Sequence, residues 1–419
     1  AGMIGALFLK ECRKIAKSLV YYVYLVAFVL FITGQMSDVE WVDQLSEPQP
    51  GQESYGYGYS NDERMIMQSG METLFQELLS NRFATYPFGF YKEVTLNEEE
   101  QEVLKRAMQQ CTGMEFEQMA EENTAYWMEI WMEAEGSAAE FSEAEMWHVP
   151  LREDLTYEEF EQVMEKACEI VGSRSYYEKS FYEKGGIVAL TYEDALEHYR
   201  ELCEDDKVSG AQMRLFCDYA CIFLAVLPIF VGVSACLKDK RAKAAELIRS
   251  RSVSGAALIG CRYLANVVMC FVPVLLCALL MQMPYVYAAG QAGIEADALA
   301  FVKYSFLWLL PVIMVVLGAA FLLTEATETI LAIPVLLAWA FGSVLSAATL
   351  TGNFGWKLVT RWNTFGSYGR YAEELGQLYR NKGMYMALAV ILVLLTVAVY
   401  EKKRRKGEML YGKLRKNNS

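Results

Sequence analysis

The sequence predicts an all-α membrane protein in which six transmembrane helices carry an inserted, mostly helical extracellular domain. Six apolar runs are long enough, at about 1.5 Å per helical residue, to cross about 30 Å of hydrocarbon with their flanks included. They are Leu19–Met36, Leu215–Leu237, Cys261–Met283, Tyr304–Leu323, Ile330–Leu350 and Met384–Tyr400.

The charge of the chain is also unevenly divided along the sequence. Residues 37–210 hold 40 Asp and Glu against 12 Lys and Arg, a net charge of −28, whereas the rest of the chain carries +14. An acidic, water-soluble domain is therefore expected inside a basic, apolar framework.

The first expected element is a short amphipathic helix over residues 3–18. Its apolar positions are Ile4, Leu7, Phe8, Cys12 and Ile15, and its basic positions are Lys10, Arg13, Lys14 and Lys17. Such a helix lies flat at the membrane surface. The alternative is that these residues form only the frayed start of the first span. Residues 19–36 are expected to stay as an anchor, because no small-residue cleavage pattern follows them.

Lys and Arg in the short flanks set the expected orientation, because cytoplasmic loops retain positive charge. Basic flanks precede the first span, follow the second and follow the sixth. With six crossings these flanks fall on one side, so both termini are expected in the cytoplasm and residues 37–210 outside the plasma membrane. The loop 351–383 carries five Lys and Arg although this count places it outside, which weakens the placement of the last two spans.

The acidic domain is expected to be mostly helical. Apolar residues at helical spacing predict a helix over Asp62–Asn81, and three capping boxes mark further helix starts. The boxes pair Asn97 with Glu100, Thr156 with Glu159 and Thr191 with Asp194. Gly185–Leu190 is consistent with one short strand. The Met and aromatic residues of Tyr126–Met132 are expected to form helical core rather than a peptide-binding face.

The cysteines leave the redox state of the acidic domain open. The chain has ten cysteines without a Cys-x-x-Cys pattern. Those in the acidic domain are Cys111, Cys168 and Cys203. An odd number cannot all pair with one another, so either one disulfide and one free thiol exist, or no disulfide exists.

The segment between the second and third spans has a pattern of its own. A basic stretch, Lys238–Lys243, precedes the helix-forming residues Ala244–Ser250. Ser252–Gly255 then breaks the helix, and Arg262 stands at the mouth of the third span. This pattern predicts a short helix at the cytoplasmic membrane face, bracketed by two spans that move with it. An ordinary loop made basic by the insertion rules is the alternative, but it does not account for the helix, the break and Arg262 together.

These residues carry a resemblance to a known family. The chain resembles the permeases of ATP-binding-cassette exporters of the second type, in the form with a large extracellular domain between the first two spans. The segments that carry this resemblance are Arg214–Tyr219, Leu227–Phe230 and Glu246–Ser250, together with Ser254 and Arg262. In that family the segment after the second span is the coupling segment, which sits in a groove of the ATPase subunit. The resemblance covers the chain outside the acidic domain, and Val253 stands where the family often has Pro.

The resemblance implies a membrane subunit that is not an enzyme and holds no cofactor, while ATP and Mg²⁺ bind to a partner ABC ATPase subunit. A second permease subunit, identical or related, completes the pathway. The implied docking residues are Glu246, Leu247, Ile248, Arg249 and Ser250, with Arg251 and Arg262 flanking.

The expected organisation begins with an interfacial helix (3–18), the first span (19–36) and the extracellular domain (37–210). The second span (211–237) and the coupling segment (238–260) follow. Spans three to six (261–400) and a cytoplasmic tail (401–419) complete the chain.

Signals for other chemistry are weak. Gly407–Leu414 has the glycine and lysine spacing of a phosphate-binding loop, but it lacks the Ser or Thr after the lysine and a preceding strand. His148 and His198 lie in no metalloprotease pattern, so a metal site is not expected.

The basic tail abuts a span and is expected to hold anionic membrane lipid rather than nucleic acid. Asp218 follows Arg214 by four residues, which predicts an ion pair within one helix.

The charge of the acidic domain favours a cationic peptide or antibiotic as exported cargo, because a field of this sign attracts cations. Solubility alone also accounts for that charge. The competing function class is a non-transporting membrane receptor or assembly factor whose extracellular domain binds a ligand. Copurification of an ATPase subunit separates the two classes.

Overall fold

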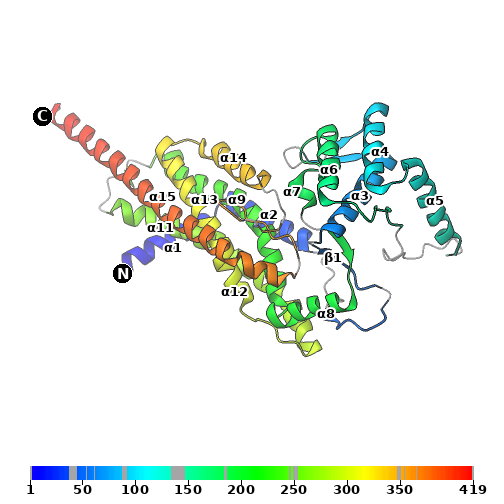
Figure 1. Cartoon of the computed structure of the whole chain (residues 1–419). Coiled ribbons are helices and arrows are strands. Elements are labelled where there is room, and N and C mark those ends of the chain that lie inside the picture. The colour runs from blue at the N-terminus through cyan, green and yellow to red at the C-terminus, as the bar shows by residue number, and fades with distance from the viewer. Residues whose placement is uncertain are drawn as a thin grey trace. The chain divides into compact units, whose positions relative to one another are not determined.

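The structure is a computed structural model. It describes residues 2–36, 45–52, 54–60, 62–86, 92–133, 147–183, 186–244, 247–248, 253–346, 351–352, 354–364 and 366–417. The described chain is mostly helical and divides into two compact units (Figure 1). We call residues 1–46 with 198–419 the membrane unit and residues 47–197 the acidic unit.

Long apolar helices make up most of the membrane unit. Its helices are α1 (Gly2–Ala16), α2 (Leu19–Met36), α9 (Ser209–Arg241), α11 (Gly255–Ala292), α12 (Ala300–Tyr304), α13 (Leu310–Thr327), α14 (Ala332–Leu345) and α15 (Tyr368–Asn417), and its π-helical turns are η4 (Glu201–Asp205) and η5 (Ser305–Leu309). Within the described residues, five helical stretches are long and apolar enough to cross a membrane. They are α2, α9, α11, the continuous stretch from α12 to α13, and α15. The chain is therefore a multi-pass, mostly helical membrane protein.

The fifth of the six expected spans is shorter than predicted. α14 is apolar but has 14 residues. At about 1.5 Å per residue it is roughly 21 Å long, less than the approximately 30 Å of a hydrocarbon core. Six crossings accordingly stay a prediction.

The centre of the membrane unit is formed by α9 and α13. α13 packs against α9 and α15, and α11 packs against α1 and α9. A Cβ added at Gly232 of α9 would lie 3.0 Å from the Leu317 side chain of α13, and one added at Gly318 would lie 3.3 Å from the Ala389 carbonyl of α15. Small residues at such positions let helix backbones approach closely, which is the main source of packing energy between helices in lipid.

The outer helices of the membrane unit carry large apolar side chains on their free surfaces. Leu30 of α2, Leu280 of α11 and Leu394 of α15 are each more than 60% exposed. Leaving a leucine in water forgoes about 1.5–3 kcal/mol per side chain. These surfaces therefore suit a hydrocarbon surround, in agreement with the length and composition of the helices.

The acidic unit is a helical domain with short strands. Its elements are β1 (Tyr57–Ser60), α3 (Glu63–Ser80), β2 (Phe83–Thr85), β3 (Lys92–Val94), α4 (Glu98–Thr112), α5 (Phe116–Glu133), α6 (Tyr157–Val171), α7 (Lys179–Tyr182), β4 (Gly186–Ala189) and α8 (Tyr192–Arg200), in the last of which the unit boundary falls. β1 pairs antiparallel with β4, and β2 pairs antiparallel with β3. The single short strand expected over Gly185–Leu190 is thus present as β4, with a partner that the sequence did not reveal.

The predicted helix starts of the acidic unit are confirmed. Asp62 caps α3 by accepting from two backbone N–H groups, and Asn81 ends it in the left-handed conformation. The capping boxes of α4 and α6 are both closed, since each capping side chain and its glutamate bond each other's backbone N–H. At the start of α8, Thr191 and Asp194 exchange the same two bonds, at 3.0 and 3.2 Å.

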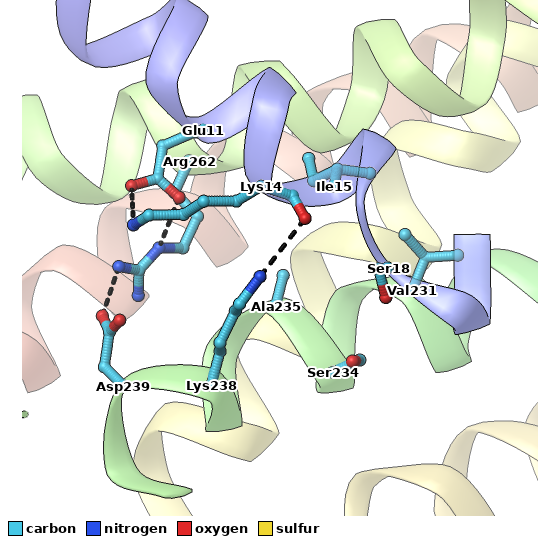
Figure 2. A pocket seen from close by; sticks show the side chains of 10 residues that line it. All are labelled: Glu11, Lys14, Ile15, Ser18, Val231, Ser234, Ala235, Lys238, Asp239 and Arg262. Atoms are coloured by element: carbon cyan, nitrogen blue, oxygen red, sulfur yellow. Dashed lines mark hydrogen bonds and ion pairs between the residues drawn. The ribbon is translucent and has the colours of Figure 1, made fainter. Parts of the chain in front are cut away.

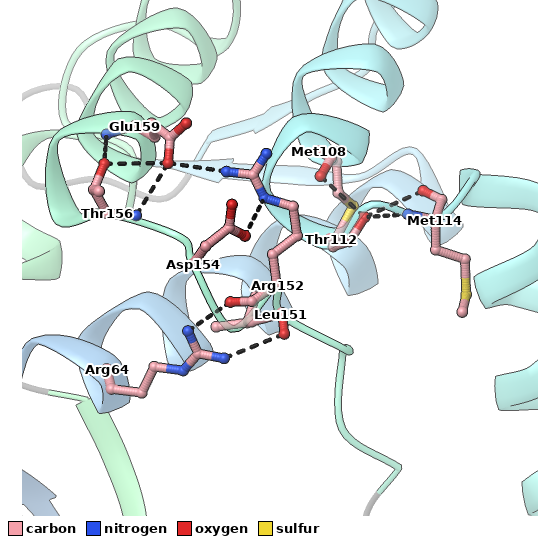
Figure 3. Close-up of polar contacts among 9 residues, drawn as sticks. All are labelled: Arg64, Met108, Thr112, Met114, Leu151, Arg152, Asp154, Thr156 and Glu159. Carbon is pink, nitrogen blue, oxygen red and sulfur yellow. Dashed lines mark hydrogen bonds and ion pairs between the residues drawn. The ribbon is translucent and has the colours of Figure 1, made fainter.

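Arginines hold the segment before α6 in place. Arg64 of α3 donates to the carbonyls of Arg152 and Leu151 at 2.8 and 3.2 Å, and Arg152 donates to Glu159 at 3.0 Å (Figure 3). Guanidinium groups suit this task because their several N–H donors have a fixed planar geometry. These bonds fasten the chain between α3 and α6.

Cys111, Cys168 and Cys203 form no disulfide in the structure, which is the second of the two expected alternatives. Cys111 is fully buried in the core of the acidic unit, and burial raises the pKa of its thiol to about 11. The thiol is therefore protonated at neutral pH and packs as a small apolar group.

The expectation that Tyr126–Met132 forms helical core is wrong for three of its residues. Met128, Trp131 and Met132 are 59%, 62% and 68% exposed. Among the described side chains of α5, the buried apolar ones are Phe116 and Met119, in its first turn. Helical spacing alone does not reveal how far along a helix the packing partner extends, which is why the later positions were misassigned.

Candidate functional site

The link between α9 and α11 begins with a sharp helix end. Lys243 has a φ of 55°, and its N–H bonds the Lys240 carbonyl at 2.9 Å. The Ala244 N–H bonds the Asp239 carbonyl at 2.9 Å, which completes a Schellman motif. A side chain in this left-handed conformation costs about 1–2 kcal/mol relative to glycine. α9 therefore stops at a defined point and turns the chain into the link.

Leu247 and Ile248 are the predicted docking residues of the link that the structure describes. They are helical, with the Ile248 N–H donating to the Ala244 carbonyl at 3.0 Å. Leu247 is 64% exposed, whereas Ile248 packs against the core of the membrane unit. Ser254 then caps α11 by accepting from the Ala257 N–H at 3.2 Å. Outside the described residues lie Glu246, Arg249, Ser250 and Arg251.

Arg262, the remaining predicted site residue, lies two turns into α11 and is 5% exposed. Its guanidinium bonds Asp239 of α9, Nη2 to Oδ2, at 2.5 Å, and its Nε is 3.5 Å from Glu11 of α1. Figure 2 shows the guanidinium between these two carboxylates. A buried charge left without partners costs several kcal/mol, so the two acids are what permit Arg262 to lie there. Arg262 thus ties α1, α9 and α11 together and is not presented on the surface of the membrane unit.

The partners of Arg262 escaped the sequence reasoning, although a signal for them exists. In the amphipathic helix expected over residues 3–18, Glu11 is the one acidic residue and stands beside four basic residues. In Lys238–Lys243, Asp239 is the one acidic residue. An isolated carboxylate in a basic stretch is poorly explained by insertion rules, and a neighbouring buried cation is the expected reason for it.

A second group of contacts joins the end of α13 and the side of α15 to the same region. Lys403 of α15 donates to the Glu325 carbonyl and, at 2.8 Å, to Glu328 Oε1. Lys240 of α9 pairs with the same Glu328 carboxylate at 3.2 Å. Glu328 ends α13 in the left-handed conformation. The carboxylate therefore joins the ends of α9 and α13 to Lys403 on the side of α15.

The start of α11 is fastened to α15 as well. The Gly255 N–H donates to Glu401 Oε1 at 2.7 Å, and Arg404 donates to the Val253 carbonyl at 3.1 Å. Both bonds fall directly after the predicted docking residues. Orphan N–H groups at a helix start need such acceptors, and here a neighbouring helix supplies one.

Two open recesses flank the Asp239–Arg262 pair. One lies between α1 and α9. The other is lined by residues of α9, α11, α13 and α15 and by Ile248 of the link. The link is thus in contact with the helix ends that the charged contacts hold together.

The ion pair expected between Arg214 and Asp218 does not form. Arg214 donates from Nη2 to Asp206 Oδ2 at 2.6 Å, and Asp218 accepts from Arg361 Nε at 2.8 Å and from the Trp362 N–H at 2.5 Å. An ion pair four residues apart on a helix is worth about 0.2–0.5 kcal/mol. A buried charged side chain needs more hydrogen-bond partners than one residue four positions away can offer. Arg214 and Asp218 therefore each pair with residues other than one another.

Other chemistries find little support in the described part of the chain. Gly407–Leu414 lies inside the continuous helix α15, whereas a phosphate-binding loop follows a strand. No group of three His, Cys, Asp or Glu side chains among the described residues is arranged to hold a metal ion. His148 is exposed and contacts Glu72 at 2.7 Å.

Comparison of the chain with protein-family models, with curated proteins and with solved structures gives no match.

Proposed function

We propose that this chain is the membrane-spanning permease subunit of an ATP-binding-cassette exporter. The observation that carries the proposal is the position of the short link between α9 and α11. Its C-terminal end is fastened to α15 through Glu401 and Arg404, and two turns farther along α11 Arg262 contacts Glu11 of α1. A force applied to the link would be transmitted to several membrane helices at once, which is what coupling to an external motor requires.

In the proposed mechanism an ABC ATPase subunit docks on Glu246, Leu247, Ile248, Arg249 and Ser250, with Arg251 beside them. Arg262 acts as a positioning residue, because its buried guanidinium keeps α1, α9 and α11 in one arrangement. ATP and Mg²⁺ bind to the partner and not to this chain. Docking changes the permease only as far as the ATPase binds one of its conformations more tightly than the other.

The complete assembly contains two permease subunits, identical or related, which enclose the export pathway. We place both termini in the cytoplasm of a cell with residues 37–210 outside the plasma membrane, and we assign α14 as the fifth of six crossings. The net charge of −28 over residues 37–210 supports a cationic peptide or antibiotic as the cargo, because the external domain then concentrates it near the pathway.

Affinity purification of the chain from its native membranes tests this function. We expect an ABC ATPase subunit to copurify, and charge reversal by Glu246→Lys or Arg249→Glu to uncouple ATP hydrolysis from transport while membrane insertion is unchanged. Lys402→Glu is the matched control, because Lys402 is exposed on α15 and lies outside the link.

Two results would contradict the proposal at different levels. Purification without any ATPase subunit favours a membrane receptor or assembly factor. Normal coupling in both link variants, with an ATPase present, refutes the docking residues and leaves the transporter assignment standing.

A further inference from the structure

The recess between α1 and α9 has the features of a binding site in its own right. Its lining is formed by Glu11, Lys14, Ile15, Ser18, Val231, Ser234, Ala235, Lys238, Asp239 and Arg262. Figure 2 shows side chains of α1 and of the last turns of α9 facing one another across it. None of the proposed docking residues 246–251 lines the recess, so its occupancy can be measured without an ATPase subunit.

The charges of the recess are incompletely balanced. Three cations and two carboxylates line it, which gives a formal net charge of +1. Arg262 is held by Asp239 and Glu11, and Lys14 pairs with Glu11 at 2.7 Å. Lys238 is the remaining cation. Its ammonium donates to the Lys14 carbonyl at 3.2 Å and has no carboxylate within ion-pair distance among the described residues.

The rest of the lining combines apolar surface with hydroxyl groups. Ile15 and Val231 are buried apolar walls, and Ala235 adds a third. Ser18 and Ser234 bring hydroxyl groups that can donate to an anion. A ligand with a single negative charge and an apolar part matches this combination better than a free inorganic ion does.

The position along the chain places the recess at the boundary between lipid and water. Ser18 directly precedes Leu19, the first residue of α2, and Lys238 opens the basic end of α9. Both membrane-spanning helices therefore leave the hydrocarbon beside the recess. Phospholipid head groups occupy this level of a bilayer, and a lysine there attracts anionic lipid.

We propose that the recess binds the phosphate group of an anionic glycerophospholipid, with the Lys238 ammonium as its charged partner. A phosphodiester carries one negative charge and neutralises the excess cation. A zwitterionic lipid brings its own cation into a recess that already holds Lys14 and Arg262, so it binds more weakly. The acyl chains extend from the recess into the hydrocarbon.

Native mass spectrometry of the full chain in a neutral detergent tests the site, because a neutral micelle has no surface charge that attracts lipid unspecifically. Phosphatidylglycerol, phosphatidylcholine and inorganic phosphate are supplied in separate arms. We expect the protein to retain one phosphatidylglycerol in preference to phosphatidylcholine. Lys238→Gln should weaken that retention about fivefold, the effect of one lysine near a head group.

Lys402→Gln is the matched control, because it removes an exposed cation of α15 that does not line the recess. It should leave retention unchanged. Ala235→Leu, which fills the recess and keeps its charges, should lower retention as Lys238→Gln does, while the melting temperature confirms that both variants are folded.

Three outcomes would overturn the proposal. Equal weakening by Lys238→Gln and Lys402→Gln shows general attraction by basic residues. Equal retention of both lipids shows an apolar surface without selection for the anion. Displacement of phosphatidylglycerol by millimolar inorganic phosphate identifies a site for soluble phosphate in place of lipid.

Discussion

At the scale of single residues, the buried ion pairs of the membrane unit join segments that are far apart in sequence. Asp218 of α9 lies 0% exposed and is bound by Arg361 and by the Trp362 N–H. Lys382 of α15 is also buried and donates to Thr360 at 2.9 Å. Both Arg361 and Lys382 lie in residues 351–383, which were expected to form an external loop and whose positive charge does not follow the insertion rule. Their use inside the fold gives these cations a structural role.

Removing one member of the Asp218–Arg361 pair should be costly. We expect Asp218→Asn to lower the stability of the protein in detergent by about 3–5 kcal/mol, because the Arg361 guanidinium is then left with an uncompensated charge. The double variant Asp218→Asn with Arg361→Gln should recover part of this loss. Thermal unfolding, recorded as the melting temperature, measures both.

The control for this pair lies in the acidic unit. Asp154 pairs with Arg152 at 3.3 Å, but its side chain is 82% exposed. An exposed pair is worth at most about 1 kcal/mol. Asp154→Asn should therefore shift the melting temperature little, and an equally small shift for Asp218→Asn would contradict the structural role of its pair.

At the scale of secondary structure elements, the end of one helix is fastened to the side of another at the start of α11. Gly255 is the residue on which this depends. A Cβ at this position would lie 2.4 Å from Glu401 Oε1 and 2.7 Å from the Tyr400 ring. No side chain larger than hydrogen fits unless α15 or its side chains move. The sequence contains this glycine as part of the Ser252–Gly255 break, and the structure adds a packing reason for it.

Gly255→Ala should therefore separate the start of α11 from α15. We expect a loss of about 1–3 kcal/mol, typical of an overpacked contact, together with the loss of the bond from the Gly255 N–H to Glu401. The melting temperature in detergent reports the loss. If the proposed coupling holds, hydrolysis by the ATPase partner also becomes less dependent on transported substrate.

Gly260 provides the comparison on the same helix. A Cβ added there meets no atom within 4 Å. Gly260→Ala should be neutral or stabilise α11 by about 0.5–1 kcal/mol, because alanine loses less backbone entropy than glycine in a helix. Similar behaviour of the two variants would show that the contact at Gly255 is unimportant.

At the scale of the whole molecule, the number of crossings decides where every loop lies. α14 is the helix on which the count depends, because its 14 residues are few for a span. With six crossings, the exposed Trp356 after α14 lies outside the cell, and Lys402 at the end of α15 lies in the cytoplasm. If α14 does not cross, both positions change sides.

Cysteine labelling in intact cells measures this directly, in a background without native cysteines. With six crossings, we expect Trp356→Cys to react with a membrane-impermeant maleimide and Lys402→Cys to react only after permeabilisation. Ser80→Cys, at an exposed position of the acidic unit, should label from outside and serves as the reference. Labelling of Lys402→Cys without permeabilisation would mean that the last helix crosses in the opposite direction.

Features that depend on local composition can be predicted from the order of the residues. Apolar runs define membrane helices because hydrocarbon admits few charges, and capping residues define helix starts because the first N–H groups need acceptors close in sequence. This is why α2, α3 and the capped ends of α4, α6 and α8 were predictable. The presence of a link between two spans was predictable for the same reason.

Which charges meet depends on how the helices pack, and the order of the residues does not reveal it. Arg262 was selected from the sequence, but its partners Glu11 and Asp239 lie on other helices. Arg214 and Asp218 were paired by spacing, and each found a different partner in space. A buried charge is stabilised by whichever opposite charge the fold brings within about 3–4 Å, and helix packing sets that distance independently of sequence separation.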